Sequence, residues 1–302
     1  MKIQSMSTFN TSTVNTSTVN TSPAEISAWP VVWMLAKREW IRFFRQPHRV
    51  VAAVGQPILF WVLFGTGLHG AFRGNGDQGF MSYYLPGTVA LILLFTAIFA
   101  TISIIEDRRE GFLQNVVVAA VPRWTIALGK TIGGAVIAWV QAAVFIALLV
   151  AFGSVPFEWS LLSLGIFMAL ASLGMTALGV CMAWPLDSTQ GFHALMNLVL
   201  MPMWLLSGAF FPIPLLQSDS PIGQSIMHWI MRLNPLTYPV AGMRWSMFPS
   251  PQFPSAQFPS AQGTAFWQPT VTLSWMVTVC FMVVTLTAAI LIVRRNAKGD
   301  IQ

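Results

Sequence analysis

Long apolar runs, each without Asp, Glu, Lys or Arg in its middle, occupy most of this 302-residue chain. A helix needs about 20 residues to cross the roughly 30 Å hydrocarbon core of a bilayer, and six runs approach or exceed that length. They are 50–68, 85–105, 131–152, 161–184, 192–211 and 271–293. The pattern predicts an all-α integral membrane protein, with six transmembrane helices in residues 50–293.

A different pattern precedes the first run, in residues 28–49. Its arginines recur at intervals of four, three and four residues, which places them on one face of a helix: Arg38, Arg42, Arg45 and Arg49. Trp33 and Trp40 fall on the other face. Indole rings and cations on opposite faces suit the plane of a membrane interface, so we predict an interfacial amphipathic helix that contacts membrane lipid. The alternative is a soluble helix packed on a cytoplasmic partner.

The two ends of the chain lack such patterns. Residues 1–27 are rich in Ser, Thr and Asn and repeat NTSTV, so we predict a disordered cytoplasmic tail. No apolar stretch follows Lys2 within this segment, which argues against a cleaved signal peptide. Residues 294–302 form a second, short cytoplasmic tail.

Two connections between the runs stand out. The inner connection, 106–124, is dense in charged residues at its start. The outer segment, 212–270, first carries apolar residues at helical intervals, which predicts one or two short helices at the outer interface: Ile222, Ile226, Trp229, Ile230 and Leu233. Its second half, SPQFPSAQFPSAQG, has too much proline for a helix and predicts a flexible loop.

Composition supports the membrane prediction. Only 9% of residues are charged and 55% are hydrophobic, whereas a soluble domain carries about 25% charged residues. The net charge of +6 does not indicate a nucleic-acid partner, because the basic residues are scattered at the ends of apolar runs. Cys181 and Cys280 both lie inside apolar runs, so we interpret them as buried thiols.

Basic residues also predict the orientation, because they accumulate in cytoplasmic loops. With the N-terminus inside and six spans, thirteen lie on the inner side: Lys2, Lys37, Arg38, Arg42, Arg45, Arg49, Arg108, Arg109, Arg123, Lys130, Arg294, Arg295 and Lys298. The outer side holds three, Arg73, Arg232 and Arg244. This bias predicts that both termini are cytoplasmic.

The sequence lacks the residue patterns of the enzyme classes that act within membranes. The His-Glu-x-x-His pattern of metalloproteases does not occur, and the four histidines are isolated, so no metal site is predicted. Ser207-Gly208 lacks the preceding glycine of a nucleophile turn. We therefore predict a transport protein without catalytic residues.

The sequence also predicts neither a proton relay nor an ATP-binding site in this chain. No span has a charged residue in its middle, which argues against a proton-coupled carrier. Gly129-Lys130-Thr131 resembles the end of a phosphate-binding loop, but Trp124 occupies the position of the first glycine. We interpret Lys130 as an interfacial anchor, predict no bound cofactor, and expect energy to enter through a partner.

Several short motifs together resemble the permease subunits of ABC type-2 (ABC-2) exporters. They are LPG at 85–87, DRREGFL at 107–113, PRWTIALGK at 122–130, LSGAFFP at 206–212 and NPLTYPVAGMR at 234–244. Their order relative to six spans makes the resemblance fairly specific. LSGAFFP and NPLTY resemble the drug and small-lipophile branch more than the polysaccharide branch.

The resemblance implies a half-transporter that forms a dimer with a second permease copy, a homodimer by preference, and docks cytoplasmic ABC ATPase subunits, which bind ATP and Mg. The amphipathic helix would be the connecting helix, through Trp33, Arg38, Trp40, Arg42 and Arg45. The inner connection would be the ATPase-coupling element, through Glu106, Asp107, Arg108, Arg109, Gly111, Phe112, Leu113, Pro122 and Arg123. Such permeases commonly have a glutamate after the Asp-Arg pair, where this chain has Arg109 followed by Glu110. This departure shifts the acid by one residue, which changes the individual ion pairs expected with the ATPase but not the role of the connection.

The resulting hypothesis is an ATP-driven exporter of a hydrophobic or amphiphilic compound in a prokaryotic plasma (inner) membrane. Two alternatives remain. One is the permease of a lipid-linked polysaccharide exporter, and the other is a secondary carrier or channel that works without an ATPase. Residues 50–152 and 161–293 show no repeat of the kind found in many carriers.

Overall fold

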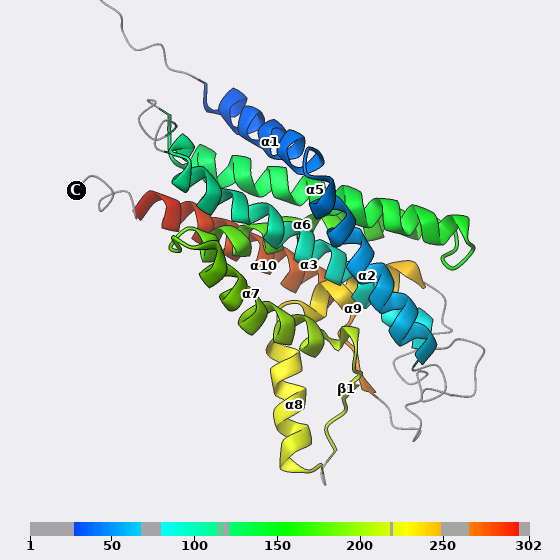
Figure 1. Cartoon of the computed structure of the whole chain (residues 1–302). Coiled ribbons are helices and arrows are strands. Elements are labelled where there is room, and N and C mark those ends of the chain that lie inside the picture. The colour runs from blue at the N-terminus through cyan, green and yellow to red at the C-terminus, as the bar shows by residue number, and fades with distance from the viewer. Residues whose placement is uncertain are drawn as a thin grey trace, which may run out of the picture.

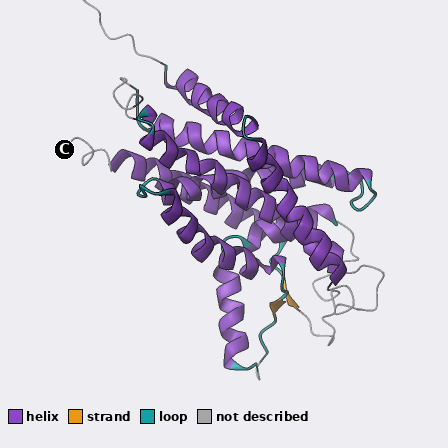
Figure 2. Cartoon of the chain, viewed as in Figure 1, coloured by secondary structure: helices purple, strands orange, loops and turns teal. Residues whose placement is uncertain are grey.

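The computed structural model describes residues 27–67, 80–113, 116, 121–217, 220–248 and 266–295, most of which are helical (Figure 2). In chain order the helices are α1 (Ala28–Phe44), α2 (Pro47–Gly67), α3 (Phe80–Arg109), α5 (Trp124–Ala151), α6 (Ser160–Ala183), α7 (Thr189–Trp204), η1 (Leu205–Ala209), α8 (Ile222–Leu233), α9 (Thr237–Met247) and α10 (Val271–Arg295). Strands β1 (Ile213–Pro214) and β2 (Phe266–Trp267) form one antiparallel pair.

Among the described residues, five helices are long and apolar enough to cross a membrane. They are Ser82–Arg109, Trp124–Ala151, Ser160–Ala183, Thr189–Ala209 and Val271–Arg295. Five of the six predicted spans lie on these helices. The sixth, 50–68, coincides with most of the 21-residue helix α2, and its role as a span stays a prediction.

Helix α3 is the centre of the bundle (Figure 1). It contacts α2, α5, α6, α7 and α9. In its most apolar stretch 89% of the residues are buried, against 28% in α10. A helix that is hydrophobic on all sides can be buried by protein or by lipid, and the burial of α3 inside the protein makes it the core on which the outer helices pack.

The amphipathic helix is shorter than predicted. We expected one helix over 28–49, but α1 ends at Phe44 and a new helix begins at Pro47. Proline has no N–H and disfavours helical backbone in the residue before it, so it ends one helix and starts the next. Arg49 therefore belongs to α2 and does not share a helix face with Arg38.

The predicted span 192–211 is interrupted near its end. After Trp204 the backbone forms the π-helical turn η1, and Gly208 has a φ of 73°, in the left-handed region that favours glycine. The Gly208 carbonyl accepts hydrogen bonds from the Tyr83 hydroxyl and from Arg244 Nη2, both at 2.9 Å. The Arg244 guanidinium also lies over the Tyr83 ring, 4.3 Å from its centroid. These contacts fasten the kink to α3 and α9.

We expected one or two short helices in the outer segment, and it contains two, of which α8 carries the apolar spacing. Helix α8 projects away from the bundle, and α9 packs against α6 and α10 (Figure 1). The predicted proline-rich loop, most of the first 27 residues and residues 296–302 lie outside the described residues.

Candidate coupling site at the basic end of the bundle

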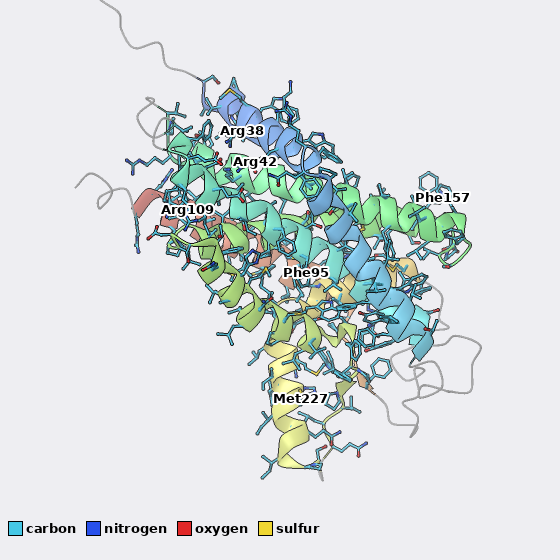
Figure 3. The ribbon with its side chains drawn as sticks, viewed as in Figure 1. Arg38, Arg42, Phe95, Arg109, Phe157 and Met227 are labelled. Atoms are coloured by element: carbon cyan, nitrogen blue, oxygen red, sulfur yellow. The ribbon has the colours of Figure 1, made fainter. Side chains whose placement is uncertain are left out.

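The residues predicted to couple the chain to a partner gather at one end of the bundle. Arg38, Arg42 and Arg109 lie at the end where α10 finishes, and Phe157 lies at the opposite end (Figure 3). The inner connection begins later than predicted, because residues 106–109 still belong to α3. Their charged side chains are therefore held on a rigid helix.

Asp107 is the centre of this end. Its side chain is 0% exposed and receives hydrogen bonds from three cations of two other helices. Arg38 donates to both carboxylate oxygens, at 2.7 and 2.8 Å, and Arg42 donates to one of them at 2.7 Å. Lys130 Nζ, from α5, donates to Oδ2. Because its partners all lie within the chain, this carboxylate is not available to a partner protein in this arrangement, and we revise its expected role from docking contact to internal anchor.

A second carboxylate, from Glu39, is buried beside Asp107. Glu39 Oε1 accepts a hydrogen bond of 2.5 Å from Lys130 Nζ, which also donates to Ser103 Oγ at 3.0 Å. The side chains of Glu39 and Lys130 are 4% and 2% exposed. Lys130 is therefore a buried ion-pair partner, and the prediction that it anchors the chain at the interface was wrong.

The cluster is electrically balanced. Its cations are Arg38, Arg42 and Lys130, and its carboxylates are Glu39, Asp107 and Glu106, which accepts from Arg42 at 2.7 Å, so three positive charges meet three negative ones. Buried charges are tolerated only when they are paired and hydrogen-bonded in this way. We call these six residues the buried ionic cluster. It fastens α1 to α3 and α5.

Arg38 contacts both the buried ionic cluster and the inner connection. Its hydrogen bonds to Asp107 raise the pKa of the guanidinium above its ordinary value, against the lowering effect of burial. The same guanidinium lies 3.7 Å from the centroid of the Phe112 ring, a cation–π contact. The start of the connection therefore packs directly on the buried ionic cluster.

Two arginines at the end of α3 donate hydrogen bonds to a different part of the chain. Arg108 donates to the carbonyl of Trp184 at 2.6 Å and to Asp187 Oδ1 at 3.1 Å, and Arg109 Nε donates to the Asp187 carbonyl at 3.2 Å. These acceptors belong to the connection between α6 and α7. The end of α3 thus binds α1 on one side and the α6–α7 connection on the other.

The remaining predicted coupling residues surround the turn after α3. Gly111 has a φ of 73°, which confirms that glycine is needed for a sharp turn there. Leu113 is buried, Arg123 is half-buried and Pro122 is exposed. Among the described side chains of this connection, Arg109, Glu110 and Pro122 are thus the most accessible.

The faces of α1 differ from the prediction. Its inward face packs against α5 through Val32, Leu35 and Ala36, and Arg38 and Arg42 turn toward α3. Trp33 is 69% exposed, Trp40 is half-buried and stacks on Phe44 at 4.8 Å between ring centroids, and Arg45 is exposed. The outward face is therefore mostly apolar with cations between.

The sequence analysis did not identify Glu39, Ser103, Lys130 or Asp187 as partners. A signal was present for two of them. Glu39 is an acid that the apolar spacing of α1 places on its inward face, and Lys130 stands at the start of an apolar run. Opposite charges in two such helices indicate a buried pair.

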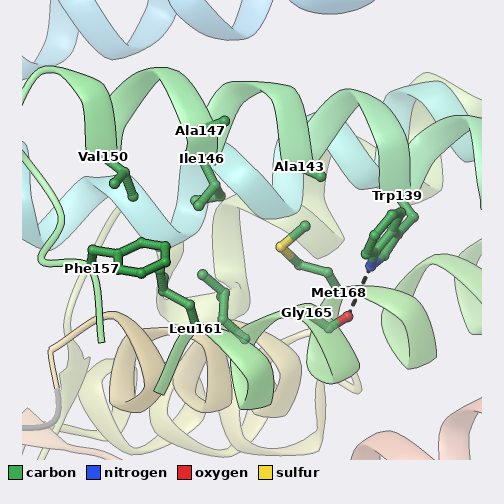
Figure 4. Close-up of a pocket in the computed structure, with 10 residues that line it drawn as sticks. Trp139, Ala143, Ile146, Ala147, Val150, Phe157, Leu161, Gly165 and Met168 are labelled. Carbon is green, nitrogen blue, oxygen red and sulfur yellow. Dashed lines mark hydrogen bonds between the residues drawn. The ribbon is translucent and has the colours of Figure 1, made fainter. Parts of the chain in front are cut away.

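A separate groove lies between α5 and α6 (Figure 4), and Phe157, one of its lining residues, lies at the opposite end of the bundle (Figure 3). It has a volume of about 340 Å³ and is lined by Trp139, Ala143, Ile146, Ala147, Val150, Phe157, Leu161, Leu164, Gly165 and Met168. Trp139 Nε1 donates to the Gly165 carbonyl at 2.9 Å, which satisfies its polar atom. The groove offers no charged side chain and suits only an apolar group. Within the described ranges, no cluster of three or more His, Cys, Asp or Glu is arranged to hold a metal ion.

Comparison with known proteins gives consistent matches. Residues 30–248 match the family model described as ABC-2 type transporter. The chain is 27% identical over 219 residues to the putative transport permease ycf38 of Cyanophora paradoxa, covering 70% of this chain and 72% of that protein. It is 23% identical over 165 residues to the probable multidrug ABC transporter permease YbhR of Escherichia coli strain K12, covering 54% of this chain and 43% of YbhR. The match to YbhR thus spans less than half of that protein's length.

Proposed function

This chain belongs to the ABC-2 type transporter family, and from that premise we propose that it is the permease subunit of an ATP-driven exporter. The family resemblance found in the sequence is thereby confirmed. Members of this family are transport permeases, typically without a catalytic site of their own, and generally work with a cytoplasmic ATPase partner. In our proposal two copies of this chain form a dimer, and separate ATPase subunits dock at the basic end.

The buried ionic cluster is the observation that carries this proposal. It joins α1, α3 and α5 immediately beside the connection that follows α3. A force applied at Glu110 or Pro122 would reach all three helices together, because buried ion pairs resist separation. Rigid elements that move as one body are a common means of turning a local contact into a displacement across the membrane.

The orientation follows from the same end of the molecule. The described basic residues gather mostly there, from α1, the end of α3, the start of α5 and the end of α10. Because basic segments resist translocation, we propose that this end faces the cytoplasm of a prokaryotic plasma membrane. The chain would then have six spans, with α2 as the first, and both termini inside.

For the substrate we propose a hydrophobic or amphiphilic compound. YbhR, a relative at low identity, is named a probable multidrug permease, which supports this class. The groove between α5 and α6 is also apolar along its whole lining. A compound that partitions into the bilayer would reach such a surface from the side.

The proposal predicts transport that depends on ATP. Inside-out membrane vesicles from cells overproducing the chain with its ATPase should accumulate rhodamine 6G, an amphiphilic dye, when ATP is supplied. Vesicles without ATP but with a proton or sodium gradient should not exceed vesicles that lack the chain. Accumulation driven by the gradient alone would favour a secondary carrier, and no accumulation under either condition would contradict the proposed substrate class.

A further inference from the structure

A basic groove lies on the outward side of α1. It has a volume of about 700 Å³, and its lining includes Lys37, Arg38, Arg42 and Arg45, with a single carboxylate from Glu110. Arg38 and Arg42 are already paired with Asp107 and Glu106 in the buried ionic cluster. Lys37 and Arg45 are exposed, and no ion pair joins either one to another described residue. Glu110 offsets one of these two charges, so the groove carries a net charge of +1 beyond the balanced cluster.

Apolar side chains stand between these two cations. Lys37, Ile41 and Arg45 are spaced by four residues, so they share one face of the helix. Ile41 and Met34 also line the groove and are 45% and 61% exposed. Nearby, Trp33 and Phe44 are 69% and 48% exposed. Such a stripe of apolar and cationic side chains is typical of helices that lie in a membrane interface.

The packing of α1 on α5 places part of α1 near the depth of lipid headgroups. A Cβ atom on Gly129 would lie 2.7 Å from Leu35 Cβ, and one on Gly133 would lie 2.9 Å from Glu39 Cβ, so the two helices touch along this stretch. Helix α5 has 28 residues and is about 42 Å long, some 12 Å longer than the hydrocarbon core. If α5 is centred, about 6 Å lies outside at each end. Gly129 follows Trp124 by five residues, or about 8 Å, and is close to that boundary, whereas Gly133 lies about 8 Å inside it.

We propose that this groove binds the headgroup of an anionic phospholipid of the inner leaflet, with Lys37 and Arg45 facing its phosphate and Met34 and Ile41 contacting its acyl chains. The charge of the groove complements the phosphate, and its apolar neighbours complement the chains. A water-exposed acidic protein surface would match the cations but would leave the apolar stripe unmatched. This inference rests on the proposed membrane orientation and does not require an ATPase.

Lipid binding to the full-length chain tests this assignment. The purified, delipidated chain would be titrated in detergent with dioleoyl phosphatidylglycerol or dioleoyl phosphatidylcholine, with bound lipids counted by native mass spectrometry. We expect phosphatidylglycerol to bind at least about tenfold more tightly. Each basic residue near a membrane surface contributes about a fivefold change in affinity, so Lys37→Gln with Arg45→Gln should weaken phosphatidylglycerol binding about 25-fold.

The matched control is Arg294→Gln with Arg295→Gln, which removes two exposed cations from α10 at the same end of the molecule. This variant should retain the tight phosphatidylglycerol site. Thermal unfolding in detergent would verify that both variants are folded, and millimolar inorganic phosphate should not displace the lipid.

Three results would overturn the assignment. They are unchanged phosphatidylglycerol binding in the Lys37 and Arg45 variant, an equal loss in the α10 variant, and displacement of the lipid by inorganic phosphate. Release of a co-purifying ATPase by the Lys37 and Arg45 variant, with lipid binding intact, would assign the groove to the partner. That outcome would leave the proposed exporter function standing.

Discussion

Replacement of Asp107 by asparagine is expected to lower the free energy of unfolding by about 3–5 kcal/mol, the usual cost of removing one member of a buried ion pair. Asp107 is completely buried and accepts hydrogen bonds from Arg38, Arg42 and Lys130. Asparagine has a similar shape but no charge. It would leave the buried ionic cluster with three cations and two carboxylates, and an amide would face donors that it cannot all satisfy.

Chemical denaturation of the purified chain in detergent would measure this change. Glu110→Gln is the matched control, because it removes one carboxylate from the same end of α3, where the side chain is 63% exposed. Exposed ion pairs contribute little to stability, so this variant should unfold like the wild type. Equal stability of the Asp107 variant and the wild type would show that the buried ionic cluster does not hold α1, α3 and α5 together.

Replacement of Gly87 by valine is expected to cost about 3 kcal/mol or more, at or above the upper end of the usual range for overpacking. A Cβ atom at Gly87 would lie 2.7 Å from Ala209 Cβ, 2.9 Å from the Ala209 carbonyl oxygen and 3.0 Å from its Cα. Two of these atoms are backbone, which cannot turn away as a flexible side chain would. The Gly87 carbonyl also accepts the Trp204 indole N–H at 2.9 Å, so a displaced helix would lose that bond.

Gly165→Val is the control for this prediction. Gly165 is also helical, but a Cβ atom there has no neighbour within 4 Å, so the same side chain meets open space. The Gly87 variant should lose thermal stability or yield of folded protein in detergent, and the Gly165 variant should not. Similar behaviour of the two variants would mean that α3 and η1 are not tightly packed against each other.

The long elements could be predicted from the sequence because length and hydrophobicity alone decide them. A run of about 20 apolar residues has few alternatives to a helix, and five of the predicted spans lie on helices long enough to cross a membrane. The break between α1 and α2 was also predictable, since Pro47 carries the signal for it. The prediction of one helix over 28–49 did not apply this rule, because the arginine spacing continues across the proline.

The ion pairs inside the buried ionic cluster could not be predicted from the sequence, for a physical reason. Asp107 lies 69 residues from Arg38 and 23 residues from Lys130 along the chain. Which cation meets which carboxylate depends on how α1, α3 and α5 pack, and periodicity within one helix does not contain that information. The coupling role of these residues stays a prediction, but Asp107 was assigned to a partner that would have had to reach a buried atom.

The kink at Gly208 also could not be predicted from the sequence. The span 192–211 reads as one apolar helix, and only the left-handed backbone of Gly208, fastened through Tyr83 and Arg244, interrupts it. Tyr83 and Arg244 are 125 and 36 residues away from Gly208. Such a turn is stabilised by tertiary contacts, which override the local preference for helix.

Co-purification of an ATP-hydrolysing subunit tests the central claim most directly. The tagged chain would be purified in mild detergent from its native host as wild type, as Glu110→Lys and as Glu158→Lys. Both glutamates are exposed, and their chain neighbours Arg109 and Phe157 lie at opposite ends of the bundle (Figure 3). The two variants therefore make the same charge change at the proposed docking end and away from it. We predict that an ATPase accompanies the wild type and Glu158→Lys and is lost from Glu110→Lys. Absence of any ATP-hydrolysing subunit from the wild type, or its loss from Glu158→Lys alone, would contradict the proposed function and its coupling site.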